Sequence, residues 1–412
     1  MFGFIRGPVV SVVSLGPLEV HDMARLTASG GRSTGRAHHI LVADAMRAAA
    51  ILFVVCYHLV WHAKPMLGHR VLTLGFLGVW GVNCFFVLTG FLLGRPYIAV
   101  LLDDAKAFPS TRQFYIRRIL RIYPMYVFTI AVTAIGLFLF AGETSTFGSV
   151  VTHLFFVQDF FQEYVYSINS PLWTMGVDAG FYLILPLTFL ALRPAFRGAA
   201  YGTRIRAIVA GLALIVLASI AYRFFQVSHH PIALYDYPAS VVYVRNLIGV
   251  ATAFAVGMLI AFLAESSVKL PQRAYAPLVV AGVVLAILEL SLRLEVNPVP
   301  STTAFLRITI EDPLAALSSG LILFGLVGAG FAPVRRFTAS RVVQTIAVLS
   351  YGIYLFHFPI IAAVKSVLFA NRQGVLVFAE LALFSLPIVA AAAALAYQFV
   401  EKPFLAMKQR HE

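Results

Sequence analysis

Two side chains that could do chemistry lie in one apolar stretch near the start of the chain, DAMRAAAILFVVCYHLVWH at residues 44–62. Arg47 and His58 are eleven residues apart, about three turns of an α-helix plus 20°, so a helix would carry both on one face. They would stand about 16 Å apart along its axis. An arginine at the centre of a membrane helix costs about 2.5–3.5 kcal/mol on insertion scales, so we expect it to face protein or a hydrated cavity.

This spacing suits a long, thin ligand that is anionic at one end and reactive at the other. Acyl-coenzyme A has that shape, with phosphates at one end, a pantetheine arm and a thioester at the tip. Two simpler interpretations stay open on these residues alone: Arg47 extends to lipid headgroups, and His58 hydrogen-bonds a neighbouring helix. The remaining motifs must decide between these interpretations.

A group of cations begins a later apolar segment, FYIRRILRIYPMY at 114–126. Arg117 and Arg121 are one helical turn apart on the same face, and Arg118 lies beside them. Because guanidinium groups match phosphate oxygens with paired hydrogen bonds, the pattern predicts a site for the coenzyme A phosphates. Anchoring to lipid headgroups is an equal alternative.

Polar residues interrupt two more apolar segments. Asn83 lies among closely spaced glycines that favour tight helix packing, and it is a candidate for substrate contact. In SPLWTMGVDAGFYLILPL, Trp173 is typical of an interfacial anchor and is also a substrate-contact candidate. Asp178 must be paired or hydrated. Both His58 and Asp178 lie within about two turns of the outer ends of their helices, which indicates an acid–base pair or a purely structural contact.

Two strings near the C-terminus add further candidates. LSYGIYLFHFPI carries Tyr354 and His357 one turn apart on one face, and we expect both to line the same cavity and contact substrate. YQFVEKPF places Glu401 at a helix end, where it serves as a cap or a partner of basic loops. Cys56 and Cys84 fall inside apolar runs, so neither a disulfide nor a metal site is expected.

A membrane is needed to position these residues. Of the 412 residues, 60% are hydrophobic and only 12% are charged, whereas a soluble domain is about half apolar and about a quarter charged. The stretch 150–161 is expected to be re-entrant or interfacial. We expect 223–242 to be an exposed loop, and contact of its His229, His230 and Tyr235 with an acceptor is the alternative. Windows of about 20 residues predict an all-α polytopic protein with ten spans and a polar cavity, near residues 41–61, 72–94, 121–141, 172–192, 207–222, 243–264, 275–292, 313–332, 345–369 and 375–399.

Basic residues fall mainly on one side of this arrangement. Of 31 Lys and Arg residues, 22 lie in the tails and the loops of one side and 8 on the other. The positive-inside rule then predicts cytoplasmic termini and an even helix count in the plasma (inner) membrane. The net charge of +13 reflects this topology, and nucleic acid is not expected as a partner. We predict a mobile cytoplasmic tail at 1–38, a membrane domain at 39–404 and a cytoplasmic tail at 405–412.

Six strings together resemble the acyltransferase-3 family of integral membrane O-acyltransferases across 39–404. They are Arg47 and His58 with ten residues between them, FFVLTGFLLG, RRILRIYPMY, LWTMGVDAGFYL, LSYGIYLFHFP and FVEKP, in the family's order. The resemblance implies that Arg47 and His58 are essential, with His58 the catalytic base. It also implies that the arginine-rich start of the third helix belongs to the acyl-CoA site. The chain departs from the family at Asp178, where Glu is usual. It also lacks the long extracytoplasmic esterase-like domain of some members, which implies a single-domain enzyme.

The expected reaction is transfer of an acyl group, with acetyl as first choice, from cytoplasmic acyl-CoA (acetyl-CoA) to a hydroxyl on the outer side. His58 takes the hydroxyl proton, since imidazole titrates near 6.5. Asp178 orients that imidazole or holds the acceptor, and an acetyl-His intermediate is a variant of the scheme. The phosphates are bound by Arg47, Arg117, Arg118 and Arg121.

The expected acceptor is a polysaccharide, lipid-linked sugar or glycolipid of the cell envelope. The LWTMGVDAGFYL string resembles actinobacterial members of the family, which makes trehalose monomycolate the first acceptor to consider. Membrane lipids and an envelope-lipid exporter are the expected partners. Two other classes stay open, a proton-coupled secondary transporter and a non-catalytic scaffold for lipid export. Transporters often carry an internal repeat, and the two halves of this sequence show none.

Overall fold

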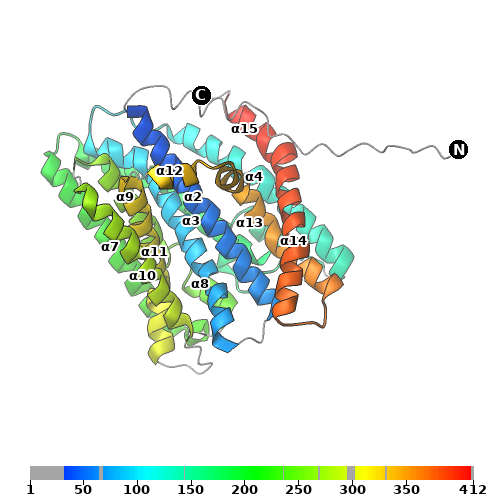
Figure 1. Ribbon diagram of the computed structural model, residues 1–412. Helices are drawn as coiled ribbons and strands as arrows, with labels where there is room; N and C mark the ends of the chain where they lie inside the picture. The colour runs from blue at the N-terminus through cyan, green and yellow to red at the C-terminus, as the bar shows by residue number, and fades with distance from the viewer. Residues whose placement is uncertain are drawn as a thin grey trace.

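The computed structural model describes residues 32–64, 68–142, 144–234, 236–267, 270–294, 302–329 and 332–409, and these contain helices and no strand. The predicted all-α polytopic class is confirmed. The helices are α2 (Arg32–Ala63), α3 (Gly68–Leu102), α4 (Thr111–Gly136), α5 (Phe147–Leu154), α6 (Trp173–Phe196), α7 (Tyr201–His229), α8 (Tyr237–Tyr243), α9 (Ala251–Glu265), α10 (Tyr275–Leu294), α11 (Thr302–Ala329), α12 (Ala332–Thr338), α13 (Arg341–Leu368), α14 (Val375–Ala396) and α15 (Lys402–Gln409) (Figure 1).

Each of the ten predicted spans coincides with a helix. Within the described residues, nine helices are long and apolar enough to cross a membrane, and the tenth, α9, has 15 residues. α9 is shorter than predicted because the chain turns at 244–250, where Asn246 Oδ1 accepts hydrogen bonds from the backbone of Ile248 and Gly249. The start of α2 and the end of α15 lie at the same end of the molecule (Figure 1), an arrangement that fits an even number of crossings.

The prediction of an exposed loop at 223–242 is wrong. Helix α7 continues to His229, and a short 3₁₀ turn (Pro231–Leu234) and α8 follow it. α7 was underestimated because Arg223 and other polar side chains interrupt its hydropathy, yet Arg223 is fully buried against protein. Tyr235 lies outside the described residues, as do 1–31 of the predicted N-terminal tail. Residues 32–38 belong to α2, so the boundary predicted at 39 falls inside a helix.

Helix α2 lies between two hydrophobic cores. Its first half belongs to a core that also contains residues of α3, α6, α9 and α11, and its second half to a core with residues of α4, α13 and α14. Figure 1 shows α2 and α3 in the middle, with α7, α9, α10 and α11 on one side and α13 and α14 on the other. Glycine permits the closest approaches, since a Cβ on Gly81 would lie 2.6 Å from the Ala50 carbonyl of α2. A Cβ on Gly257 of α9 would lie 2.1 Å from the Val87 carbonyl of α3. The functional side chains of α2 and α3 are therefore held at a fixed separation.

The chain between α4 and α6 folds into the protein instead of crossing it. Buried side chains hold it there: Gln158 donates to the Leu172 carbonyl at 2.9 Å, and Asn169 donates to the Leu355 carbonyl of α13 at 2.9 Å. These bonds join the start of α6 to the middle of α13. As a result, α6 begins among buried residues, and Trp173 at its first position is only 6% exposed.

Candidate active site

Two neighbouring cavities contain most of the residues that the sequence singled out. The first, here the arginine cavity, has a volume of about 150 Å³ and is lined by Arg47, Arg118 and Arg121. The second, here the histidine cavity, has a volume of about 40 Å³ and is lined by His58. Both cavities share three lining residues, Val82, Phe86 and Tyr354. The two cavities therefore adjoin, with the arginines in one and His58 in the other.

Helices α2 and α4 supply the cations of the arginine cavity. α4 begins where the Ser110 hydroxyl accepts a hydrogen bond from the backbone N–H of Gln113 at 3.4 Å, and Arg118 and Arg121 follow on one face of its second and third turns. Neither has an ion pair with a described residue. Arg47 pairs with Asp44 one turn earlier, at 2.9 Å. The sequence grouped Arg117 with Arg121, but Arg117 lines neither cavity.

Asp178 lies in the arginine cavity, beside Tyr182 and within electrostatic reach of Arg118. The contact between Asp178 and His58 that the sequence suggested is therefore not formed. The depth of Asp178 was estimated on the assumption that α6 starts at the membrane surface. Because the preceding segment is folded inward, Trp173 is buried instead of anchoring at an interface, and it lines the histidine cavity. Asp178, more than one turn further along α6, is carried toward the arginines.

The partner of His58 is His357 of α13. His58 Nδ1 lies 3.0 Å from His357 Nε2, and the two ring centroids are 4.8 Å apart. His58 Nδ1 also lies 3.0 Å from the Val54 carbonyl. His357 is fully buried, and its Nδ1 lies 2.7 Å from the Tyr354 carbonyl and 3.1 Å from that of Ile353. The sequence placed His357 on the cavity wall, whereas the structure places it behind His58.

These contacts allow one arrangement of protons in the neutral pair. Carbonyl oxygens only accept, so His357 Nδ1 carries a proton and its Nε2 is an acceptor. His58 Nδ1 faces two acceptors, the Val54 carbonyl and His357 Nε2, and must carry a proton as well. His58 Nε2 then holds a free lone pair and has no hydrogen-bond partner among the described residues. The geometry leaves the basic nitrogen available to a molecule in the histidine cavity.

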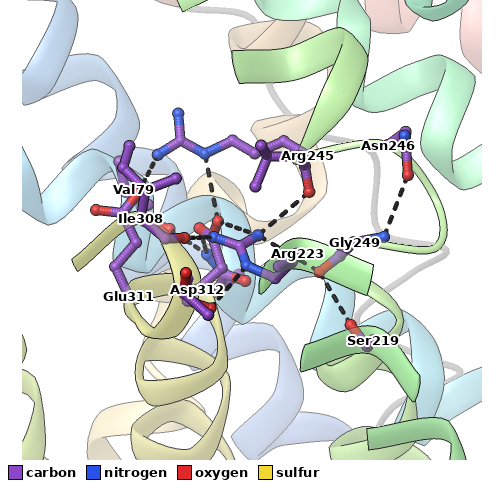
Figure 2. Close-up of polar contacts among 12 residues, drawn as sticks. Val79, Ser219, Arg223, Arg245, Asn246, Gly249, Ile308, Glu311 and Asp312 are labelled. Atoms are coloured by element: carbon purple, nitrogen blue, oxygen red, sulfur yellow. Dashed lines mark hydrogen bonds and ion pairs between the residues drawn. The ribbon is translucent and has the colours of Figure 1, made fainter. Parts of the chain in front are cut away.

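A buried charge cluster forms the far side of the histidine cavity (Figure 2). Arg245 bonds to Glu311 and, at 3.3 Å, to Asp312, and Arg223 pairs with Asp312 at 2.8 Å. Asn83 donates from Nδ2 to Asp312 at 2.8 Å. All five side chains belong to residues that are at most 5% exposed, and Asn83, Arg245 and Asp312 line the cavity.

Sequence reasoning missed four of these five residues. Arg245 lies at the start of the span predicted at 243–264, and Asp312 lies just before the span predicted at 313–332. The sequence does contain a feature that could have indicated this cluster. Apolar runs are interrupted by two arginines, Arg223 and Arg245, and by the acidic pair at 311–312. Charged residues at membrane depth require partners, so four such residues of balanced sign indicate mutual pairing.

Tyr354 stands at the wall that the two cavities share. Its hydroxyl donates to the Pro171 carbonyl at 2.9 Å and lies 2.7 Å from the Thr174 hydroxyl. This fixes the phenol between α13 and the start of α6, and the backbone carbonyl of the same residue accepts from His357 Nδ1. Tyr354 therefore borders the path from the arginines to His58.

Comparison with known proteins gives a match to a family model described as an acyltransferase domain, over residues 41–397. A Bacillus subtilis (strain 168) protein, YrhL, provisionally named a peptidoglycan O-acetyltransferase, is 26% identical over 87% of this chain and 54% of its own length. Acyltransferase MdmB of Streptomyces mycarofaciens is 29% identical over 36% of this chain and 38% of its own. O-acetyltransferase OatA of Staphylococcus aureus (strain NCTC 8325 / PS 47) is 27% identical over 37% and 25%. The chain spans about half the length, or less, of these relatives. No solved structure matches it.

Proposed function

The chain belongs to the acyltransferase-3 family, and from this premise we propose that it transfers an acyl group, with acetyl as first choice, from acyl-CoA to a hydroxyl of a cell-envelope glycan or glycolipid. The observation that carries the proposal is the junction of the two cavities: cations line one, a free imidazole nitrogen lines the other, and Tyr354 borders both. Multiple apolar helices make the protein a multi-pass membrane protein, and the excess of cations on the side of both termini favours a cytoplasmic donor.

The arginine cavity is the donor site in this proposal. Arg118 and Arg121 have no ion-pair partners among the described residues, so they are free to form charge-assisted hydrogen bonds with phosphate oxygens. Arg47 adds a third guanidinium from α2. The pantetheine arm then extends along α2, past Tyr354, and the thioester reaches His58 about 16 Å further along the helix.

His58 acts as general base. As the acceptor oxygen attacks the thioester carbonyl carbon, His58 Nε2 takes the hydroxyl proton, the carbon–sulfur bond breaks, and the thiolate that leaves takes up the proton. His357 holds the imidazole in the required tautomer and accepts a hydrogen bond from the Nδ1–H that remains when His58 is protonated. Asp178 is too close to the arginines to orient this imidazole, so we assign it to the donor side.

The acceptor is proposed from the relatives and from the sequence. YrhL carries a name that refers to peptidoglycan, and the LWTMGVDAGFYL string favours trehalose monomycolate. An envelope-lipid exporter is the partner that would supply or remove such a lipid. Membership of an acyltransferase family makes the transporter and scaffold alternatives unnecessary.

The test uses the full chain reconstituted in lipid vesicles with acetyl-CoA and an envelope-lipid extract. We expect release of coenzyme A coupled to acetylation of one lipid class. His58→Ala should lower the rate by about 10²–10⁴-fold, the usual contribution of a general base. His62→Ala, one turn further along α2, is the matched control and should keep the rate. Full activity of His58→Ala with an unchanged melting temperature would contradict the proposal.

A further inference from the structure

We propose that an apolar groove between α4 and α6 binds one anionic phospholipid of the surrounding bilayer, with its phosphate on Arg118, and that this lipid competes with the acyl donor. The lipid site itself needs only the groove and the cation, whereas the competition rests on the proposed donor site. Three features support the site: the groove opens to lipid, a guanidinium borders it without an ion pair to a described residue, and the groove adjoins the arginine cavity.

The groove has a volume of about 180 Å³, against about 150 Å³ for the arginine cavity. Nine of the eleven described residues that line it are uncharged. Along α4 it extends from Tyr115 to Tyr123, which are about 12 Å apart at the rise of an α-helix. Ile119 and Leu183 line it and are 57% and 59% exposed, and both belong to apolar helices long enough to cross the membrane. The groove therefore opens to the hydrocarbon of the bilayer.

Both ends of the groove are fixed by contacts between chain segments. The Tyr115 hydroxyl donates a hydrogen bond to the Leu183 carbonyl at 2.8 Å, which joins α4 to α6 near the start of α4. At the other end, the ring centroids of Tyr123 and Phe156 are 6.1 Å apart. The groove thus has a defined length, set by the packing of α4 against α6 and against the segment that precedes α6.

Arg118 stands where the groove meets the arginine cavity and lines both. Asp178 also lines both, and it is the one acid among the described residues of the groove. Its carboxylate is within electrostatic reach of Arg118 but forms no ion pair with it, so it offsets that cation only in part. The charge left for a ligand at Arg118 is small, which suits the single negative charge of a phosphodiester.

The position of the groove favours a phospholipid over the acyl chain of the donor. In acyl-CoA the pantetheine arm separates the phosphates from the acyl group, and the proposed reaction places that group beside His58 in the other cavity. The groove instead adjoins Arg118, at the phosphate end. In a phospholipid, a single glycerol joins the chains to the phosphate, so one molecule can place a chain in the groove and its phosphate on Arg118.

Charge, more than the chain, decides which lipid binds. A chain gains little by leaving the bilayer for the groove, since lipid tails are as apolar as the side chains that line it. The groove gives the chain a place, so that the phosphate can reach Arg118. A hydrogen bond between charged groups contributes about tenfold or more in affinity. Phosphatidylcholine brings an ammonium group with its phosphate, so it should bind less tightly than phosphatidylglycerol.

Native mass spectrometry of the full-length protein in detergent measures this binding directly. The probes are phosphatidylglycerol, phosphatidylcholine and glycerol phosphate, which has the anion without the chain. We expect one phosphatidylglycerol to be retained at least about tenfold more tightly than phosphatidylcholine, and glycerol phosphate not to be retained. Equal retention of the two lipids, or of glycerol phosphate and phosphatidylglycerol, would overturn the site.

Two variants fill the groove from opposite helices. Ala179→Phe on α6 and Ile119→Trp on α4 each enlarge a side chain that lines the groove but not the arginine cavity, and each should release the lipid. Ala191→Phe is the matched control, because Ala191 is exposed on α6 and lines neither space, and it should retain the lipid. Retention of phosphatidylglycerol in both filled variants would refute the groove as its binding site.

Competition is measured as the KM for acetyl-CoA in vesicles of phosphatidylcholine alone or mixed equally with phosphatidylglycerol. A negative membrane surface also repels coenzyme A, so the comparison among variants carries the test. A competitor raises KM in proportion to 1 + [L]/Kd, and we expect phosphatidylglycerol to raise KM at least about threefold more in the native protein and in Ala191→Phe than in Ala179→Phe. Equal increases in all three would overturn the competition. Absence of His58-dependent coenzyme A release in every vesicle would instead refute the proposed function, while the lipid retention measured by mass spectrometry would still stand.

Discussion

The two cavities use arginine in opposite ways. In the arginine cavity, Arg118 and Arg121 face the space without an ion pair to any described residue. In the histidine cavity, Arg245 is held by Glu311 and Asp312, and Arg223 behind it shares Asp312. The same side chain therefore faces one cavity without an ion pair and is held by carboxylates at the other.

This difference supports the proposed donor site. Positive charge without an ion pair in a space of low dielectric attracts an anion, which suits the phosphates of a nucleotide donor. Arg245 is already held by Glu311 and Asp312, so the histidine cavity suits a phosphate less well. Val82, Phe86 and Tyr354 border both spaces, so the two ligands meet where their reacting groups belong.

Removing one charge from the balanced cluster should have the largest effect on the fold. We expect Asp312→Ala to destabilise the protein by about 3–5 kcal/mol, because it leaves Arg223 and Arg245 buried with too few partners. Thermal unfolding in detergent, followed by circular dichroism, measures the change. Arg121→Ala in the arginine cavity is the matched removal of an unbalanced charge and should not lower the melting temperature. Equal losses in both variants would erase the distinction between the cavities.

Removing the unpaired arginines should affect the donor and leave stability unchanged. Arg118→Ala and Arg121→Ala should each weaken coenzyme A binding about tenfold or more, since a hydrogen bond to a charged group is worth about 1.5–3 kcal/mol. Isothermal titration calorimetry at low and high salt measures the Kd, and salt should weaken binding to the native protein more than to the variants. Arg117→Ala, adjacent in sequence but outside both cavities, is the control. A loss of affinity there equal to that of Arg118→Ala would mean that the helix, not the cavity, binds the phosphates.

The histidine pair should affect turnover only. His357→Ala removes the acceptor of the His58 Nδ1–H, and we expect kcat to fall about tenfold to hundredfold while KM for acetyl-CoA stays constant. His357→Gln offers an amide oxygen in its place and should recover part of the loss. A purely structural role predicts equal defects in the two variants, with lowered melting temperatures. Steady-state kinetics and thermal unfolding together separate the two outcomes.

The sequence predicted the helices well and the contacts of the site poorly, for a physical reason. A membrane requires about 20 apolar residues per crossing, so every span is visible in hydropathy alone, and the ten predicted segments all coincide with helices. Which side chains pair with one another depends instead on tertiary packing. Nothing in the local sequence shows that Arg223 pairs with Asp312, which is 89 residues further along the chain. Nor does it show that the neighbour of His58 is His357 and not Asp178. The inward fold of the segment before α6 decides the second case. The sequence indicated a re-entrant or interfacial stretch at 150–161, but not the contacts that the folded segment makes.

The smallest expected effect concerns the one ion pair of the arginine cavity. Asp44 and Arg47 are 2.9 Å apart, but their side chains are 20% and 25% exposed, so the pair is worth about 0–1 kcal/mol. Asp44→Asn removes a carboxylate that competes with a phosphate for Arg47, and we expect coenzyme A affinity to be maintained or to rise by up to about fivefold. The calorimetric assay used for Arg118 measures this change, and the melting temperature should move little. A marked loss of affinity would show that Arg47 needs its carboxylate to face the cavity, and that the donor site depends on paired charge.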